Sequence, residues 1–376
     1  MPIFYGIETS KFGLTAPNGI VRWESDGRLP VSGFGSYAVT RRKNFMKRTR
    51  RTRIFLLLVV VALVAAACSS DSGDEDVAST TEAVDLSQGS DLTFYMVTHA
   101  DDGTFWSVVK RGAEDAAKAM GVTLVWSPSF NDPEKQVQDI EAAIAAGADG
   151  LGVSLASPEA VGPAAKAAAD AGIPVYTINS GVNQYKGLGA TTHIGQTEIV
   201  AGNGAGEFFN TLGANTVLCA RQEQSNVGLE ERCQGLAETF NGTVVSEFVG
   251  EDSDPTGQEA SISALLQANP DIDGVLGTGP NIAVRAVSAC ETAGRDCSIG
   301  GFDISNDIIA ALEAGTVDFT VDQQQYLQGY LPIILMYLEV TNLNTAGGGL
   351  PILTGPGFVT TENVAEVKDL VNAGTR

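Results

Sequence analysis

The sequence predicts an α/β fold made of two doubly wound lobes, each with a parallel sheet between layers of helices. From Asp91 to the C-terminus, short apolar runs alternate with Ala-rich helical patterns. The runs are apolar on both faces, which is typical of strands in buried parallel sheets. The chain has 376 residues, of which 44% are hydrophobic, so it is long enough to form two domains, each with its own core.

The first set of elements extends from residue 92 to residue 179. Its expected strands are LTFYMVT (92–98), VTLVWS (122–127), GLGVSL (150–155) and IPVYTIN (173–179). Its expected helices cover 104–120, 134–147 and 158–171. The second of these helices ends at Gly147, because glycine readily adopts the left-handed conformation that follows a helix.

The second set repeats this rhythm and ends near residue 322. Its expected strands are TVLCAR (216–221), TVVSEFV (243–249), DGVLGT (273–278), SIGGFDI (298–304) and VDFTVD (317–322). Helices are expected to begin near residues 227, 257, 281 and 306. With about five strands in each set, helical crossovers of right-handed sense would give two parallel sheets.

The N-terminal part of the chain predicts export. KRTRRTR (47–53) is followed by IFLLLVVVALVAAA (54–67) and then Cys68. A basic segment, a short apolar segment and small residues before a cleavage point are the parts of a signal peptide. As a helix, the 14 apolar residues span about 21 Å, which is less than the roughly 30 Å hydrocarbon core of a membrane. We therefore expect residues 46–67 to be a removable signal peptide.

The segments on either side of this signal are not expected to fold. Residues 1–45 stand too far ahead of the basic run, and Met46 directly precedes it, so we interpret 1–45 as a non-native extension. Residues 68–90 are rich in Ser, Asp and Glu and have no apolar period. We expect this segment to be a flexible acidic tether.

The charge of the chain is unevenly distributed. The first 67 residues carry 11 Lys/Arg and 3 Asp/Glu, whereas the rest of the chain carries 12 and 42. A body this acidic repels phosphate backbones and anionic lipid surfaces, so we expect no nucleic-acid partner. The charge favours solubility and does not identify a ligand.

Five segments carry a resemblance to known families. The small residues before Cys68, followed by SSDSGDED, resemble the lipobox of bacterial lipoproteins, in which the cysteine is lipidated. The body resembles the ribose/galactose-type (type 1) periplasmic solute-binding proteins of sugar ABC transporters. The resemblance rests on FWSVVKRGAEDAAKAMGV, HIGQTEIVAGNGAGE, IGGFDISNDIIAALEAG and VDFTVDQQQYLQGYLPI, which occur in the family's order.

This resemblance implies two lobes joined by a three-segment hinge, with crossings near Gln196, Gln324 and Pro351. The N-terminal lobe would comprise 91–196 and 324–353, and the C-terminal lobe 197–323 and 354–376. A small carbohydrate-like ligand would bind between the lobes, at the carboxyl ends of the strands. The resemblance further implies a monomer without cofactor or metal, a membrane contact through lipidated Cys68 alone, and an ABC permease with its ATPase as partners.

The resemblance also implies site residues near the first strand and near the second crossing. Phe105 and Trp106 match an aromatic pair that stacks on the sugar ring, with core packing as the alternative role. Asp102 matches a polar position there, although the loop is about one residue longer than usual and Asp101 is an alternative. Asp303 matches the family's sugar-binding carboxylate. The alternative role for Asp303 is to cap the next helix, but Ser305 is available for that role. Gln323 matches a glutamine at the second crossing.

Three further residues are candidates. Asn179 stands where ribose-binding proteins have an Asp-Arg pair, so a pentose-type ion pair is not expected. Glu223 and Asn226 lie in the RQEQSN loop (221–226) after a strand. The family's arginine in the following helix aligns near Glu230 or Arg232.

Other motifs do not support other functions. GNGAGE (202–207) has the wrong spacing for a dinucleotide fingerprint and lies inside a predicted helix. EDSDPTG (251–257) lacks the alternating ligands of a calcium loop, so we predict a turn with a helix cap. His99 and His193 are the two histidines, and they form neither a zinc spacing nor a Ser-His-Asp set. We expect His99 to line the cleft and His193 to be structural.

The remaining cysteines predict disulfides. Cys219, Cys233, Cys290 and Cys297 are an even number in an exported chain, and they allow three pairings. Short loops favour Cys219 with Cys233 and Cys290 with Cys297, each stabilising the fold by about 2–3 kcal/mol.

The sequence thus predicts an extracytoplasmic binding protein that delivers a small sugar or polyol to an ABC permease and has no catalytic activity. Two alternatives remain. The first is a signalling receptor for a diffusible sugar-like molecule, which neighbouring permease genes would argue against. The second is a carbohydrate-active enzyme, which turnover assays would reveal.

Overall fold

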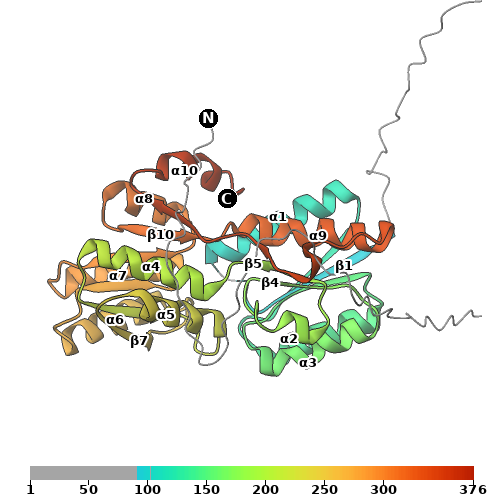
Figure 1. Cartoon of the computed structure of the whole chain (residues 1–376), viewed down its shortest axis with the longest axis horizontal. Helices are drawn as coiled ribbons and strands as arrows, with labels where there is room; N and C mark the ends of the chain where they lie inside the picture. Colours follow the sequence, from blue (N-terminus) through green and yellow to red (C-terminus); the bar gives the residue numbers. More distant parts are fainter. Residues whose placement is uncertain (1–90, 102) are drawn as a thin grey trace, which may run out of the picture. The chain divides into compact units, whose positions relative to one another are not determined.

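The computed structural model describes residues 91–101 and 103–376. The predicted signal peptide, lipidation site Cys68, tether and Asp102 therefore lie outside the described residues. Within them the chain forms two six-stranded sheets whose strands are joined by helices (Figure 1). This arrangement is the predicted doubly wound α/β fold.

The first sheet has the strand order β11-β5-β4-β3-β1-β2. Its strands are β1 (Thr93–Thr98), β2 (Thr123–Pro128), β3 (Gly150–Ser154), β4 (Val175–Ile178), β5 (Thr192–Gly195) and β11 (Ile352–Leu353). Every pairing in this sheet is parallel. The strand order reverses between β1 and β3, and at such a switch point the loops leave the carboxyl ends of the strands in opposite directions.

Four long helices cover the two faces of this sheet. They are α1 (Gly103–Met120), α2 (Pro133–Ala146), α3 (Pro158–Asp170) and α9 (Gln325–Asn342), and η1 (Tyr185–Leu188) and η2 (Gly347–Gly349) are short 3-10 turns. Figure 1 shows α1 and α9 together on one side of the sheet and α2 and α3 together on the other. Alternate residues of β1 follow this division, because Phe94 and Met96 belong to the core with α1 and α9, whereas Val97 belongs to the core with α2 and α3.

The second sheet has the order β12-β10-β9-β8-β6-β7. Its strands are β6 (Thr216–Arg221), β7 (Thr243–Phe248), β8 (Gly274–Gly277), β9 (Ser298–Phe302), β10 (Phe319–Asp322) and β12 (Gly357–Thr360). Its helices are α4 (Glu198–Leu212), α5 (Val227–Thr239), α6 (Pro255–Ala268), α7 (Pro280–Thr292), α8 (Asn306–Ala314) and α10 (Val364–Asn372).

The first sheet contains two strands, β5 and β11, beyond the four that the sequence predicts, and the second contains one more than predicted, β12, and is not wholly parallel. The strand β12 pairs with β10 in the antiparallel sense. The two late strands are short, with two residues in β11 and four in β12, so neither shows an apolar period long enough to be recognised.

Three connections pass between the two sheets. The first leads from β5 to α4, the second from β10 to α9, and the third from β11 to β12 through residues 354–356. The third lies a few residues beyond the expected position at Pro351. The second needs a left-handed backbone at Gln324, where φ is 53°.

The EDSDPTG segment folds as a turn and a cap, as predicted. Asp254 is the N-cap residue of α6, and its carboxylate accepts a hydrogen bond from the backbone N–H of Gly257 at 2.9 Å. Pro255 occupies the first helical position, which needs no backbone donor.

Candidate functional site

A cavity lies where the carboxyl ends of strands from the two sheets meet. Its lining comes from the loops and helix starts after β1, β4, β6, β7, β8 and β9, and from the connection after β10. The lining residues are His99, Gly103, Thr104, Phe105, Trp106, Asn179, Gln222, Glu223, Asn226, Leu229, Arg232, Asp252, Pro280, Asn281, Asp303 and Gln323. This is the edge at which doubly wound sheets bind ligands.

Asp303 is held in the cavity wall by its backbone and by Gln323. It follows the last residue of β9 with a positive φ of 69°, and Ser305, not Asp303, caps α8. The Gln323 amide donates a hydrogen bond to the Asp303 carboxylate at 2.7 Å. The connection from β10 to α9, which contains Gln323, therefore helps to orient the Asp303 side chain. Burial raises the pKa of Asp303 to about 7, although Arg232 and Gln323 act in the opposite direction.

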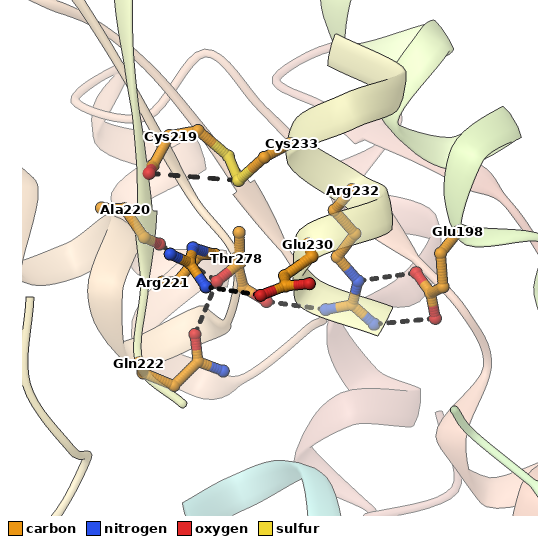
Figure 2. Close-up of a disulfide and its surroundings, with 9 residues drawn as sticks. All are labelled: Glu198, Cys219, Ala220, Arg221, Gln222, Glu230, Arg232, Cys233 and Thr278. Carbon is orange, nitrogen blue, oxygen red and sulfur yellow. Dashed lines mark hydrogen bonds and ion pairs between the residues drawn. A yellow bond between two sulfur atoms is a disulfide. The ribbon is translucent and has the colours of Figure 1, made fainter. Parts of the chain in front are cut away.

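Arg232 is the guanidinium of the site, and a buried carboxylate holds it. Its Nε and Nη2 donate to Glu198 at 2.6 and 3.1 Å, and its Nη1 donates to the carbonyl of Thr278 at 2.6 Å (Figure 2). Its Nη1 also lies 3.9 Å from Asp303. Burial acts to lower the pKa of Arg232, but the carboxylates of Glu198 and Asp303 outweigh it and raise the pKa above its usual value.

A second polar group forms around Glu223. The Asn226 amide donates to Glu223 at 2.8 Å, and His99 Nε2 lies 3.4 Å from the same carboxylate oxygen. Although burial acts to raise it, the pKa of Glu223 lies below its usual value because His99 and Asn226 face the carboxylate. Glu223 therefore presents a charged acceptor to the cavity.

The tautomer of His99 follows from its contact with Ser154. The Ser154 hydroxyl oxygen accepts a hydrogen bond from the His99 backbone N–H at 2.8 Å and lies 2.7 Å from His99 Nδ1. The Ser154 hydroxyl can donate its hydrogen bond to Nδ1 while it accepts one from the His99 backbone N–H. In that arrangement Nδ1 is the acceptor, so the ring proton is on Nε2, facing Glu223. We assign that tautomer to neutral His99.

The two aromatic residues serve the core and the cavity together. Phe105 and Trp106 begin α1, both are buried, and both line the cavity. The Trp106 ring meets the rings of His99 and Phe105 edge to face, with centroids 4.9 and 5.1 Å apart. These contacts fix the orientation of Trp106 through the fold rather than through a ligand.

Contacts across the cavity join the loops of the two sheets. Ser180, which follows β4, lies 3.0 Å from the Asn226 side chain through its hydroxyl. The backbone N–H of Val227 donates to the carbonyl of Ala156 at 3.0 Å. Asn179, beside Ser180, adopts a positive φ of 60° and lines the cavity. The first turn of α5 thus contacts the first sheet's loops directly.

The structure brings seven of the eight predicted ligand residues to this one cavity. They are Phe105, Trp106, Asn179, Glu223, Asn226, Asp303 and Gln323. The eighth, Asp102, lies outside the described residues. The alternative Asp101 accepts a hydrogen bond from the Trp126 indole at 2.8 Å and is not part of the lining.

Sequence reasoning missed or underestimated several lining residues. Gln222 directly follows β6 and Asn281 lies in the first turn of the helix after β8, so their position near a strand's carboxyl end was a usable signal. Of the two alternatives Glu230 and Arg232, Arg232 lines the cavity, whereas Glu230 is exposed and lies 3.5 Å from Arg221. Glu198 is outside the lining but holds Arg232; it had no sequence signal, since this role depends on a partner 34 residues away.

The structure also places His193 and the four cysteines of the folded body. His193 is buried beside Thr177, and burial lowers its pKa to about 3. Disulfides join Cys219 to Cys233 and Cys290 to Cys297, the pairings that short loops favour. In residues 91–101 and 103–376, no three His, Cys, Asp or Glu side chains are grouped so as to hold a metal ion.

Comparison with known proteins identifies the family. The family described as periplasmic binding protein domain matches residues 94–342, which is more than half of the chain. The chain belongs to the periplasmic binding protein family. Members of this family bind solutes outside the cytoplasm for transporters. No helix of this binding protein, within the part that the structure describes, is both long and apolar enough to cross a membrane.

Individual relatives resemble this binding protein over most of its body. A crystal structure of a carbohydrate transporter from Acidothermus cellulolyticus, in complex with myo-inositol, is 38% identical with a TM-score of 0.74, covering 76% of this chain and 100% of that one. The xylose/arabinose-binding protein of Sulfolobus acidocaldarius is 27% identical over 71% of each chain. The ribose import binding protein of Haemophilus influenzae is 28% identical over 67% of this chain and 87% of its own.

Proposed function

We propose that this protein is the extracytoplasmic receptor of an ABC importer, that it captures one small sugar or cyclic polyol in the cavity between its sheets, and that it has no catalytic role. The observation that carries the proposal is the ring of paired donors and acceptors at the carboxyl ends of both sheets. The relatives whose names state a ligand include proteins for ribose, xylose and arabinose, and a structure with myo-inositol. That structure, at 38% identity, makes a cyclic polyol the first candidate.

The polar lining suits hydroxyl groups. A hydroxyl donates one hydrogen bond and accepts others, so it fits best between a carboxylate and an amide or guanidinium. Asp303 stands between Gln323 and Arg232, and Glu223 stands beside Asn226 and His99. Each cluster offers an ionisable acceptor next to N–H donors, which is the pattern that a pair of neighbouring ring hydroxyls requires.

The charge of the lining favours an uncharged ligand. Among the lining residues, Glu223, Asp252 and Asp303 carry carboxylates and Arg232 is the guanidinium, while lysine does not occur. Glu198 already engages Arg232, and Arg285 pairs with Asp252, so Glu223 and Asp303 remain as the acidic groups of the lining without a dedicated cation. A ligand carboxylate or phosphate would face uncompensated negative charge in a buried site, which is energetically costly. We therefore infer a neutral polyol or sugar rather than a uronic acid or a sugar phosphate.

We infer that the two sheets are the centres of two lobes that close around the ligand. The proposed lobes are 91–196 with 324–353, and 197–323 with 354–376. The assignment of strands to sheets supports this division, because the chain passes from one sheet to the other three times. The contact of Asn226 with Ser180 would then form on closure, when the lobes surround the ligand.

A thermal-shift screen followed by calorimetry tests the proposal. The panel contains myo-inositol, ribose, xylose, arabinose, glucose and galactose, with galacturonate and glucose 6-phosphate as charged controls. A ligand present at 100 times its Kd adds about 2.7 kcal/mol to stability, which shifts the melting temperature measurably. We expect at least one neutral compound to bind and both charged compounds to fail.

Two variants locate the binding site once a compound binds. Asp303→Ala should weaken binding by about 10- to 150-fold, because ligand hydroxyls lose a charged acceptor. Trp106→Ala should also weaken it, through loss of the ring face. Asp149→Ala, far from the cavity lining, is the control. Unchanged affinity in both site variants, with the fold intact, would place the ligand elsewhere.

We further propose that the protein is exported as a lipoprotein and acts as a monomer. The basic run, the short apolar run and the small residues before Cys68 support cleavage there and attachment to the outer face of the cytoplasmic membrane. The acidic segment 68–90 would then separate the binding body from the membrane surface. The permease and its ATPase are the partners that this placement implies.

A further inference from the structure

The chain segment closed by the Cys219–Cys233 disulfide supplies a large share of the residues that line the cavity. It joins β6, which lies between β7 and β8 in the second sheet, to α5, and the two cysteines are separated by 14 positions in the sequence. Five of the sixteen lining residues lie inside the closed segment, namely Gln222, Glu223, Asn226, Leu229 and Arg232. The segment thus supplies both a carboxylate and the guanidinium of the site.

The contacts that these side chains make require α5 to stay close to its present position. Arg232 directly precedes Cys233, and its guanidinium meets Glu198 on α4 and the Thr278 carbonyl after β8 (Figure 2). Both members of this ion pair are buried, so a small displacement would leave two desolvated charges misaligned. Figure 2 shows the disulfide tying the helix to the strand one residue from this arginine.

The start of the segment is constrained in the same way. Gln222 follows β6 directly, and its amide oxygen accepts a hydrogen bond from the Thr278 hydroxyl at 2.7 Å. Asn226 caps α5 and contacts Glu223 and, across the cavity, Ser180. The loop between β6 and α5 therefore carries ligand-facing groups at both ends, and the disulfide limits how far those ends can separate.

We propose that the Cys219–Cys233 disulfide is a positioning element of the ligand site, which holds the Gln222–Arg232 segment in its binding arrangement. Both sulfur atoms belong to buried residues, with Cys219 0% and Cys233 5% exposed, so the bridge is part of the interior and not a surface crosslink. For its affinity readout the inference rests on the proposed function.

The second disulfide provides a matched control. Cys290–Cys297 lies in the same sheet domain and joins the end of α7 to the residue before β9. It encloses none of the lining residues, since Pro280 and Asn281 lie at the other end of α7 and Asp303 follows β9. Removing it changes the number of crosslinks without freeing a segment of the site.

The experiment compares two double variants of the full chain, Cys219→Ala/Cys233→Ala and Cys290→Ala/Cys297→Ala. Their affinities for myo-inositol are measured by calorimetry well below both melting temperatures. We expect the Cys219→Ala/Cys233→Ala variant to raise Kd about tenfold, because the binding arrangement would then be populated about a tenth of the time. The Cys290→Ala/Cys297→Ala variant should change Kd less than about twofold. Should the first variant not fold, Cys219→Val/Cys233→Ala restores the lost volume.

A double-mutant cycle separates positioning from general stability. Asn226→Ala lies inside the closed segment, and Asn281→Ala lies in the lining but outside it. We expect the effect of removing the Cys219–Cys233 bridge to be non-additive with Asn226→Ala and additive with Asn281→Ala. The proposal is overturned if the effects are additive in both cases and removal of either bridge leaves Kd unchanged. The disulfide would then be a stabilising crosslink only.

Hydrogen exchange supplies a readout that needs no ligand. In the ligand-free protein, amides of the Gln222–Arg232 segment should exchange about tenfold faster without the Cys219–Cys233 bridge and unchanged without the other. If wild-type protein does not bind myo-inositol, the first candidate ligand is wrong, and exchange in this segment still decides the positioning claim. Equal protection in both variants would contradict it.

Discussion

Asp303 is a buried acidic residue in the cavity wall, and its negative charge costs the ligand-free protein stability. Burial raises its pKa to about 7, above the roughly 3.9 of an unfolded chain. Between these values the folded state binds more protons than the unfolded state, so stability falls as pH rises from about 4 to 7. The residue is therefore suited to accepting ligand hydrogen bonds and poorly suited to stabilising the fold.

We expect Asp303→Asn to be more stable than wild type at pH 8 in the absence of ligand. The amide keeps an oxygen for Gln323 and removes the buried charge, while Arg232 retains Glu198. The advantage should shrink by about 1.4 kcal/mol per pH unit as pH falls from 7 toward 4. Urea unfolding across this range measures it. A variant less stable than wild type at pH 8 would show that Arg232 needs the second carboxylate.

His193 should produce the opposite pH dependence. Burial lowers its pKa to about 3, so between pH 6.5 and 3 the unfolded chain binds a proton that the folded protein excludes. Stability contributed by neutral His193 is complete above pH 6.5 and is lost as pH falls, by about 1.4 kcal/mol per unit.

The variant His193→Gln removes this titration. We expect its stability, measured by urea unfolding, to decline less between pH 6.5 and 4 than that of wild type, whatever its value at pH 7. The comparison uses Thr177→Val, which alters the neighbouring hydrogen bond and keeps the histidine. An identical decline in wild type and His193→Gln would mean that another group controls the acid limit.

At the scale of elements, glycines set how closely pairs of helices approach. On α4 and α5, a Cβ at Gly202 would come within 2.2 Å of the Arg232 carbonyl oxygen, and one at Gly235 within 2.2 Å of the Ile199 carbonyl oxygen. The GNGAGE segment, which superficially resembles a nucleotide fingerprint, is thus a packing surface. This close approach brings Glu198 on α4 to Arg232 on α5.

We expect Gly202→Ala to destabilise the protein by about 1–3 kcal/mol, although alanine is the better helix former. The added methyl must push α4 and α5 apart, which should also weaken ligand binding through Arg232. Chemical denaturation and calorimetry measure the two effects. Gly187→Ala is the control, because a Cβ there meets nothing within 4 Å. Equal stability of the two variants would show that the helices adjust freely.

At the scale of the whole molecule, the proposed lipid anchor determines where the receptor works. We expect Cys68→Ala to release the protein from membranes or to leave its signal peptide uncleaved, since the apolar run 54–67 is too short to span the bilayer. Cell fractionation and mass spectrometry of the mature N-terminus measure both outcomes. Cys290→Ala, which removes a cysteine from the folded body, is the control. A soluble wild-type protein with another N-terminus would refute lipidation.

The sequence, with the family resemblance it carries, predicted the doubly wound architecture and much of the lining of the candidate cavity. Strand and helix periods are local, because they depend on which residues a few positions apart share a face. Asp303 and Trp106 were candidates because they match the site of the family that the sequence resembles, and Glu223 because it lies in a loop after a strand; parallel sheets bring such strand ends to one edge. Short loops likewise favoured the two cysteine pairings that the structure contains.

Only the tertiary structure decided which groups meet. The Arg232–Glu198 ion pair joins residues 34 positions apart, and His99 faces Glu223 from the other sheet. The short strands β11 and β12 owe their place to pairing rather than to a pattern of their own. Local periodicity records the face on which a side chain lies, whereas its partner is set by how helices and sheets pack, and that packing arises from contacts distant in sequence.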